Sequence, residues 1–203
     1  MKLNKIEFLL MNNPIRGYIQ EKVEVRRLRT LSSLEPHKNV LEIGCGNGTG
    51  TKLIQKYFKP EKIHAIDLDQ RMIEKAVKKN MDSTISFAVG DATKLQFENN
   101  QFDAVVDFGI IHHIPNWEKC LEELKRVLKP GGELILEDLS IDTFNTLPGR
   151  VYRLFLAHPY AQMYTTNQFI TYLKKLQFEI AVQERFHPLR MIQYFVVIAH
   201  KRE

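Results

Sequence analysis

Residues 40–50 read VLEIGCGNGTG, a short apolar run that leads into four closely spaced glycines. The run over residues 39–43 has the composition of a buried strand, and the glycines allow the positive φ angles of a tight turn close to a ligand. A helical pattern follows over residues 49–58 and stops before Pro60. A strand, a glycine turn and a helix in this order predict the ligand-binding corner of an α/β protein.

The same alternation continues along the chain. Further strands are predicted at residues 62–66, 84–89, 102–108, 133–139, 178–184 and 192–200. Helices are predicted at residues 17–34, 70–80, 117–128 and 166–176. The last two strands are separated by a short join that contains Pro188, which is typical of a hairpin. The prediction is an α/β fold with a doubly wound, mostly parallel seven-stranded sheet, helices on both faces and an antiparallel edge hairpin.

Composition excludes several classes of protein. With 203 residues, 44% hydrophobic and 26% charged, the chain is of single-domain size and is not a disordered protein. No run approaches the roughly 20 apolar residues of a membrane span. Cys45 and Cys120 form no CxxC motif and have no Cys or His nearby at metal-ligand spacing, so we expect a cytoplasmic protein without a metal site. The formal charge of +5 favours solvated basic helix faces over a nucleic-acid surface, which stays open.

The glycine spacing argues against two common phosphate-binding motifs. In a G-x-G-x-x-G fingerprint the third glycine would fall on Thr49, Thr51 or Leu53, depending on the register. No register places a glycine directly before Lys52 either, as a P-loop requires. A nicotinamide-dependent oxidoreductase is therefore disfavoured.

Acidic residues follow the next two predicted strands. Asp67 ends the second strand, where its carboxylate could accept hydrogen bonds from both hydroxyls of a ribose, and Leu68 could pack on an adenine face. Asp69 fits the cap of the following helix better. Asp91 closes the third strand in the sequence VGDAT, where it could meet an adenine amino group or cap a turn. Together with the glycine turn, these acids predict a nucleoside site at one edge of the sheet.

The ordered motifs VLEIGCGNGTG, AIDLD, VGDATKLQF, FDAVVDFGIIHHI and LKPGGELILED resemble those of class I S-adenosylmethionine-dependent methyltransferases. The resemblance covers roughly residues 38–139 and is closest to the small-molecule group that includes ubiquinone and menaquinone biosynthesis enzymes. It implies a Rossmann-like methyltransferase fold, S-adenosyl-L-methionine as cofactor and S-adenosyl-L-homocysteine as product. The sequence shows no internal repeat and no linker that would divide the chain. We therefore expect one methyltransferase domain over residues 1–203, with an N-terminal helical cap (1–37), a cofactor-binding half (38–139) and an acceptor-side segment with the C-terminal strands (140–203).

Carried over by position, the resemblance assigns cofactor contacts to the three strand ends and to the end of the fourth strand. These residues are Glu42, Gly44, Cys45, Gly46, Gly48, Asp67, Leu68, Asp91, Ala92, Asp107, Phe108 and Gly109.

Two histidines, His112 and His113, follow the fourth strand, where the methyl acceptor is expected. Histidine titrates near neutral pH, so either residue could remove a proton from the acceptor or orient it. The sequence around Asp107 lacks the Pro-Pro-aromatic run of enzymes that methylate base amines, which favours a small-molecule acceptor. An RNA or protein methyltransferase, a non-catalytic S-adenosylmethionine-binding module and a homodimer stay open as alternatives.

Overall fold

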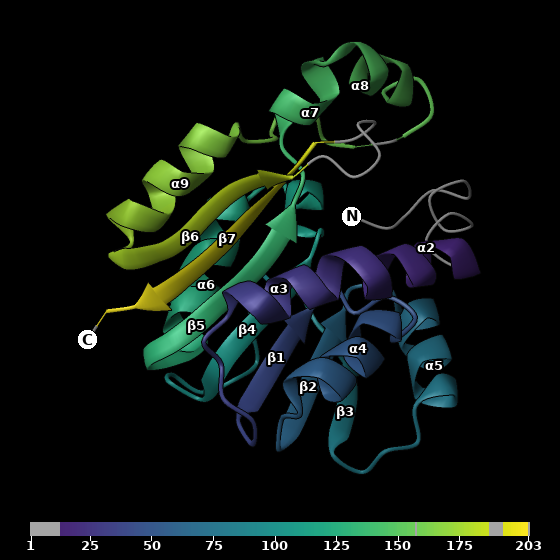
Figure 1. Ribbon diagram of the computed structural model, residues 1–203, viewed down its shortest axis with the longest axis vertical. Helices are drawn as coiled ribbons and strands as arrows, with labels where there is room; N and C mark the ends of the chain where they lie inside the picture. Colours follow the sequence, from purple (N-terminus) through teal and green to yellow (C-terminus); the bar gives the residue numbers. More distant parts are fainter. Residues whose placement is uncertain (1–12, 157, 187–192, 203) are drawn as a thin grey trace.

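A computed structural model describes residues 13–156, 158–186 and 193–202. Seven strands form one sheet in the order β3-β2-β1-β4-β5-β7-β6 (Figure 1). The strands are β1 (Asn39–Ile43), β2 (Lys62–Asp67), β3 (Ile85–Val89), β4 (Phe102–Phe108), β5 (Leu128–Asp138), β6 (Phe178–Phe186) and β7 (Tyr194–Lys201). The pairs from β3 to β5 are parallel, whereas β7 runs antiparallel to both β5 and β6. The predicted fold class, including the antiparallel edge, is confirmed.

Helices cover both faces of this sheet (Figure 1). They are α2 (Pro14–Ile19), the π-helical stretch η1 (Gln20–Val25), α3 (Arg26–Leu31), α4 (Thr49–Phe58), α5 (Gln70–Lys79), the 3₁₀ turn η2 (Ile111–His113), α6 (Trp117–Val127), α7 (Ile141–Asn145), α8 (Leu147–Tyr152) and α9 (Thr166–Lys175). The first three of these elements follow one another without a break and end at Leu31, three residues before the predicted end at residue 34. The predicted helices over residues 49–58, 70–80, 117–128 and 166–176 are all present, with ends that differ by no more than one residue.

The core lies in two layers because side chains alternate along each strand. On one face, Leu41 and Val105 pack with apolar residues of α6 and α9. On the other, Val40 and Val106 pack with apolar residues of α3 and α4. Burial on both faces explains why the central strands read as nearly continuous apolar runs.

Strand β5 differs from its predicted bounds. It begins at Leu128, opposite Phe102, and the register with β4 then shifts before Ala104 pairs with Glu133. The Pro130-Gly131-Gly132 turn therefore lies within this irregular strand instead of between a helix and a strand. Gly131 has a φ of +74° there, a conformation that glycine adopts without steric cost.

The segment after β5 contains structure that the sequence did not reveal. Residues 141–152 form α7 and α8, two helices too short for a periodic pattern to be recognised. The predicted hairpin join over residues 185–191 lies largely outside the described residues. None of the helices in the described ranges is long and apolar enough to cross a bilayer.

Candidate functional site

A cavity of about 520 Å³ lies at the carboxyl ends of the parallel strands. Its walls include the glycine turn after β1, the ends of β2 and β3, and the loop that follows β4. Part of the segment after α8 also lines it, through Leu156 and His158. The volume is typical of a small-molecule site, and the position is the one expected in an open α/β sheet.

Backbone from the glycine turn forms one wall. Gly44 and Gly46 line the cavity with φ angles of +64° and +53°, which side-chain-bearing residues rarely adopt. A Cβ on Gly44 would lie 2.3 Å from Cγ2 of Ile110, so this glycine is required by packing. A Cβ on Gly46 would meet nothing within 4 Å. This backbone is therefore open to the close approach of a ligand.

Asp67 joins the end of β2 to the glycine turn. The Gly46 N–H donates to Asp67 Oδ2 at 2.9 Å, and the Asp69 N–H donates to Oδ1 at 2.8 Å. Burial raises the pKa of Asp67, an effect that these two backbone donors oppose. Leu68, which also lines the cavity, keeps 44% of its surface exposed. As predicted, Asp69 caps α5, because its side chain accepts the Arg71 N–H at 3.0 Å.

Asp91 and Ala92 form the wall after β3. Asp91 accepts the Thr93 N–H at 2.8 Å and the Thr93 hydroxyl at 2.7 Å. The turn-capping role considered from the sequence is thus present in the structure, and it does not remove Asp91 from the cavity wall. Ala92 is 7% exposed and continues the same wall.

The end of β4 contributes two of its three candidate residues to the cavity. Phe108 and Gly109 line it, whereas Asp107 is fully buried behind them and accepts the Ile110 N–H at 2.9 Å. Burial, followed by the charge of Asp138, raises the pKa of Asp107 well above its usual range. Asp107 is thus a structural group under the site.

Three further candidates also lie behind the wall. Glu42 is 2% exposed and accepts a hydrogen bond from the Thr51 hydroxyl of α4. Cys45 is buried in the layer beneath α4, where burial raises the pKa of its thiol. Gly48 caps α4 in a left-handed conformation, and a Cβ there would lie 2.5 Å from Asn80 Nδ2. In this structure the three residues shape the turn and do not line the cavity.

Glu42 makes stability depend on pH. Burial, supported by the charge of Asp67, raises the pKa of Glu42 from 4.5 to about 8. The folded protein therefore keeps a proton between these pH values that the unfolded chain releases, so stability from this group is complete below pH 4.5 and is lost as pH rises through about 8. We expect Glu42→Gln to gain stability relative to the parent protein as pH rises, by up to about 1.4 kcal/mol per pH unit.

Urea unfolding at several pH values between about 5 and 8 measures this difference. Thr51→Val provides a second variant. The Thr51 hydroxyl lowers the pKa of Glu42, so its loss should raise that pKa and extend to higher pH the range over which stability falls with pH. A stability difference between Glu42→Gln and the parent that stays constant with pH would contradict the prediction.

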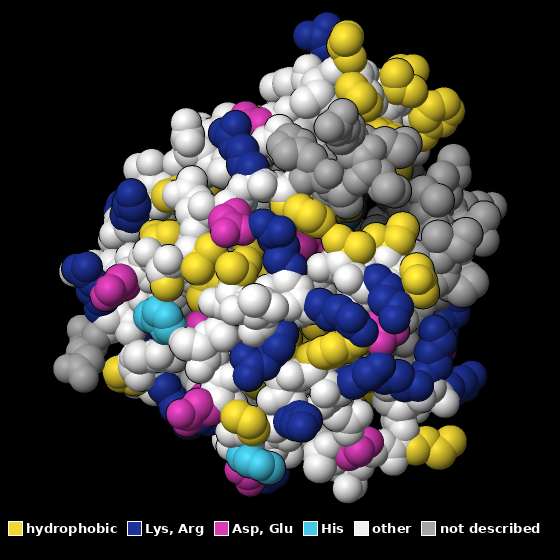
Figure 2. Space-filling model, viewed as in Figure 1, with side chains coloured by type: hydrophobic (Ala, Val, Ile, Leu, Met, Phe, Trp, Pro, Cys, Tyr) yellow, Lys and Arg dark blue, Asp and Glu magenta, His cyan; other side chains and the backbone are white. Residues whose placement is uncertain are grey.

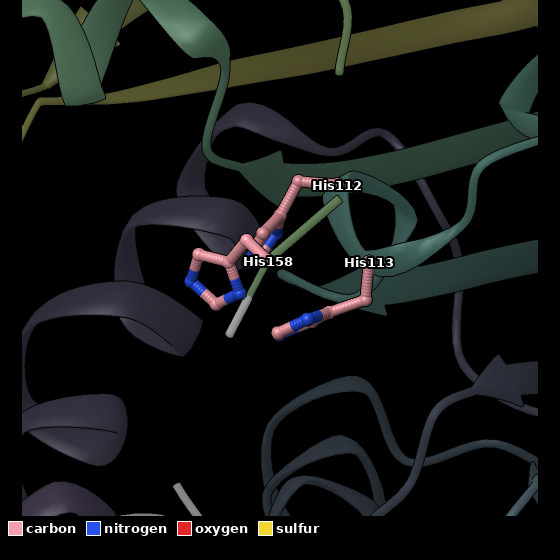
Figure 3. Close-up of side chains that lie close together, drawn as sticks. All are labelled: His112, His113 and His158. Atoms are coloured by element: carbon pink, nitrogen blue, oxygen red, sulfur yellow. The ribbon is translucent and has the colours of Figure 1, made fainter. Parts of the chain in front are cut away.

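The opposite wall of the cavity carries histidines. His112 and His113 lie on η2, and His158 approaches them from the segment after α8 (Figure 3). The ring centroids are 4.1 Å apart for His112 and His113, 5.1 Å for His112 and His158, and 4.4 Å for His113 and His158. No pattern in the sequence around His158 indicates that this residue returns to the end of β4.

A buried carboxylate orients the first of these rings. Asp138, at the end of β5, is hydrogen-bonded to Nδ1 of His112, and the His112 N–H also donates to it, at 3.1 Å. Its other donors are the Tyr164 hydroxyl and the Leu139 N–H, each at 2.7 Å. Since Nδ1 of His112 is held by the carboxylate, Nε2 is the nitrogen left to act on a ligand.

The other two rings are unprotonated at neutral pH. Burial, then the neighbouring histidines, lowers the pKa of His113 well below its usual value. Burial, followed by His112, lowers the pKa of His158 to about 3. Each of these imidazoles therefore offers a lone pair on one ring nitrogen.

Comparison with known proteins agrees with this architecture. The sheet order and the position of the cavity define a Rossmann-like α/β fold. Residues 41–136 match the family described as "Methyltransferase domain". This stretch, just under half of the chain, is therefore similar to methyltransferase domains.

Individual relatives are methyltransferases of small molecules by name. The chain is 34% identical over 102 residues to phthiotriol/phenolphthiotriol dimycocerosates methyltransferase of Mycobacterium leprae, covering 50% of this chain and 38% of that protein. It is 35% identical over 101 residues to fatty-acid O-methyltransferase of Mycolicibacterium smegmatis, covering 50% and 37%. The alignments thus span well under half the length of these relatives.

Solved structures share the fold at low identity. A methyltransferase in complex with the Trm112 activator of Haloferax volcanii superposes with a TM-score of 0.79 at 15% identity, covering 93% of both chains. An S-adenosylmethionine-dependent methyltransferase from Aquifex aeolicus superposes with a TM-score of 0.74 at 20% identity, covering 98% of this chain and 100% of that chain. The fold is therefore shared over nearly the whole chain.

Proposed function

We propose that this protein transfers a methyl group from S-adenosylmethionine to a small-molecule acceptor. The observation that carries the proposal is one continuous cavity, which has Gly46 and Asp67 on one side and His112 and His113 on the other. The first side suits a nucleoside and the second suits an acceptor that must be oriented or deprotonated.

The residues present suit S-adenosylmethionine. The carboxylate of Asp67 would hold the ribose hydroxyls, and Leu68 would contact the adenine. Asp91 and Ala92 would meet the adenine edge, and the open backbone of Gly46 leaves space beside the methionine part. The remaining contacts are assigned to Gly44, Phe108 and Gly109, with Glu42, Cys45, Gly48 and Asp107 supporting the turn from behind.

Little side-chain chemistry is needed for the transfer. When bound, the cofactor would supply a methyl group on a sulfonium sulfur. An acceptor lone pair would form the new bond to the methyl carbon while the methyl–sulfur bond breaks and its electron pair stays on sulfur. The walls hold the acceptor in line and exclude water, and positioning of this kind supplies on the order of 7–11 kcal/mol. His112, oriented by Asp138, would accept the acceptor's proton at Nε2.

An apolar acceptor agrees with the walls and with the surface beside them. Ile110, Ile114, Leu139 and Leu156 line the cavity next to the histidines. Around α8, side chains of Leu147, Val151, Leu154 and Phe155 are 81%, 56%, 78% and 59% exposed. Figure 2 shows hydrophobic side chains gathered at this end of the molecule. Lipid-like hydroxyl or carboxyl compounds are therefore the first acceptors to test.

An RNA or protein acceptor has less support. Figure 2 shows Lys and Arg side chains interspersed with acidic ones over the helices. Lys56 pairs with Glu21 at 2.5 Å, and Arg27 pairs with Glu184. Such pairing matches solvated helix faces better than a continuous phosphate-binding surface.

The same proposal covers the domain layout, the cellular compartment and the oligomeric state of the protein. Residues 1–203 form one methyltransferase domain, in which the cap (1–37) and the acceptor-side segment (140–203) flank the cofactor half (38–139). Both cysteines are buried and unpaired in the described part of the chain, which agrees with a reducing cytoplasm. A homodimer stays an alternative to a monomer, and sedimentation of the purified protein distinguishes them.

Titration calorimetry with S-adenosylmethionine, S-adenosylhomocysteine and NAD tests the cofactor assignment. We expect micromolar-range binding of both adenosyl ligands and none of NAD. Transfer of a labelled methyl group to fatty acids and other lipid-like acceptors then tests the reaction. Cofactor binding without transfer to any acceptor would favour a non-catalytic module, and absence of binding by folded protein would refute the proposal.

A further inference from the structure

His112, His113 and His158 converge on one point of the cavity wall. One ring nitrogen from each residue lies within 4.8 Å of those from the other two (Figure 3). Two of the rings come from η2 and the third from the segment after α8, so the cluster ties the acceptor-side segment to the end of β4. Three mutually adjacent imidazoles in one wall need a reason beyond packing, since each ring carries polar atoms that require partners.

The hydrogen bonds of the cluster are incomplete without a ligand. Nδ1 of His113 is buried and has no hydrogen-bond partner among the described residues. An unsatisfied buried polar atom is costly in free energy. A cation bound to Nδ1 of His113 would remove this cost.

One member of the cluster is oriented as metal-binding histidines usually are. Nδ1 of His112 is hydrogen-bonded to Asp138, a buried carboxylate that also accepts the Tyr164 hydroxyl. A carboxylate on one ring nitrogen fixes the tautomer and makes the other nitrogen a better ligand. Nε2 of His112 is therefore the atom available to a metal.

We propose that His112, His113 and His158 bind a divalent transition-metal ion of the zinc type. Such ions bind imidazole nitrogen at about 2.0–2.1 Å, which in tetrahedral geometry separates the nitrogens by about 3.4 Å. Small side-chain rotations that shift the ring nitrogens by about an ångström would bring them from their present spacing to this distance. The all-nitrogen ligand set selects zinc, cobalt or nickel over magnesium and calcium, which prefer oxygen.

The open side of the ion would face the cavity. Three protein ligands leave a fourth position, as in catalytic zinc sites, and all three histidines line the cavity that also contains Asp67. If the proposed methyl transfer is correct, an oxygen of the acceptor would bind there, and the bound ion, in place of Nε2 of His112, would favour loss of the acceptor's proton. The sequence predicted no metal, because the three histidines come together only in the folded chain.

Metal titration of tag-free protein, first stripped with a chelator, tests the site. We expect one equivalent of Zn²⁺ by calorimetry, visible absorption from one equivalent of Co²⁺, and no binding of Mg²⁺ at the same concentrations. His113→Ala and His158→Gln should each weaken Zn²⁺ binding by at least about 100-fold, and Asp138→Asn by about 10- to 100-fold. His64→Ala is the matched control, because His64 also contacts aromatic rings but lies on β2 away from the cavity, and it should leave binding unchanged.

Circular dichroism establishes that each variant is folded. Zn²⁺ binding of equal strength in the parent, His113→Ala and His158→Gln would overturn the proposal, as would a parent protein that binds neither Zn²⁺ nor Co²⁺. S-adenosylmethionine is titrated separately into protein kept free of metal. If the parent protein does not bind S-adenosylmethionine, only the proposed function is refuted. If it binds S-adenosylmethionine but no metal, only the metal site is refuted.

Discussion

Asp67→Asn is expected to weaken S-adenosylmethionine binding by about 10- to 100-fold. Hydrogen bonds to a charged group are each worth about 1.5–3 kcal/mol, and the asparagine loses the charge and one acceptor oxygen. The carboxylate also accepts the N–H groups of Gly46 and Asp69, so the amide of asparagine would place a donor against a donor. Both effects act against the cofactor, one at the ribose and one through the glycine turn. Calorimetry of the variant beside the parent protein measures the change in dissociation constant.

Asp103→Asn separates loss of the ligand contact from general damage. Asp103 likewise accepts a backbone N–H, from Asn39 at 2.9 Å, and the ammonium group of Lys129 at 2.8 Å. It lies near the start of β4, at the end of the strand away from the cavity. We expect this control to lose some stability and to keep the parent's affinity. Equal affinities for Asp67→Asn and the parent would refute the role assigned to Asp67.

Asp138→Ala is expected to destabilise the protein by about 4 kcal/mol. The substitution removes the common acceptor of the His112 N–H, the Leu139 N–H and the Tyr164 hydroxyl, and leaves these groups buried without it. Each buried group that loses its partner costs about 1–3 kcal/mol. For a chain of this size the loss corresponds to a fall in Tm of about 10 °C, which calorimetric or circular-dichroism melting would detect.

Asp142→Ala is the matched control for this loss. Asp142 lies in the same segment but accepts only the Thr166 N–H at 2.9 Å and the Ser140 hydroxyl at 3.3 Å among the described residues. We expect a cost of about 1 kcal/mol there. Asp138→Asn, which keeps one acceptor oxygen, should fall between the two. If Asp138→Ala melts no lower than Asp142→Ala, Asp138 does not hold the histidine wall together.

These two aspartates anchor opposite sides of one cavity. Asp67 ties the end of β2 to the glycine turn, and Asp138 ties the end of β5 to η2. The methyl donor and its acceptor would therefore meet between two separately stabilised walls. This division predicts that Asp67 variants chiefly change cofactor affinity, whereas Asp138 variants chiefly disturb the cavity wall that carries the histidines.

The sequence by itself determined the sheet, most helices and the place of the cavity wall that we assign to the cofactor. Signals for these features are local: the alternation of apolar runs with helical periods, the glycines at Gly44 and Gly46, and the acids at Asp67 and Asp91. Each is read from residues within a few positions of one another. Parallel strands then bring their carboxyl ends to one edge, so the motifs converge without further information.

Only the tertiary structure decided which candidates reach the cavity. Glu42 and Cys45 occupy the same turn as Gly44 and Gly46 but lie behind the wall, because side chains of adjacent residues leave the chain in different directions. His158 reaches His112 and His113 through α7 and α8, and Asp138 meets His112 across two neighbouring strands. Contacts between residues distant in sequence depend on how whole elements pack, and no local pattern carries that information.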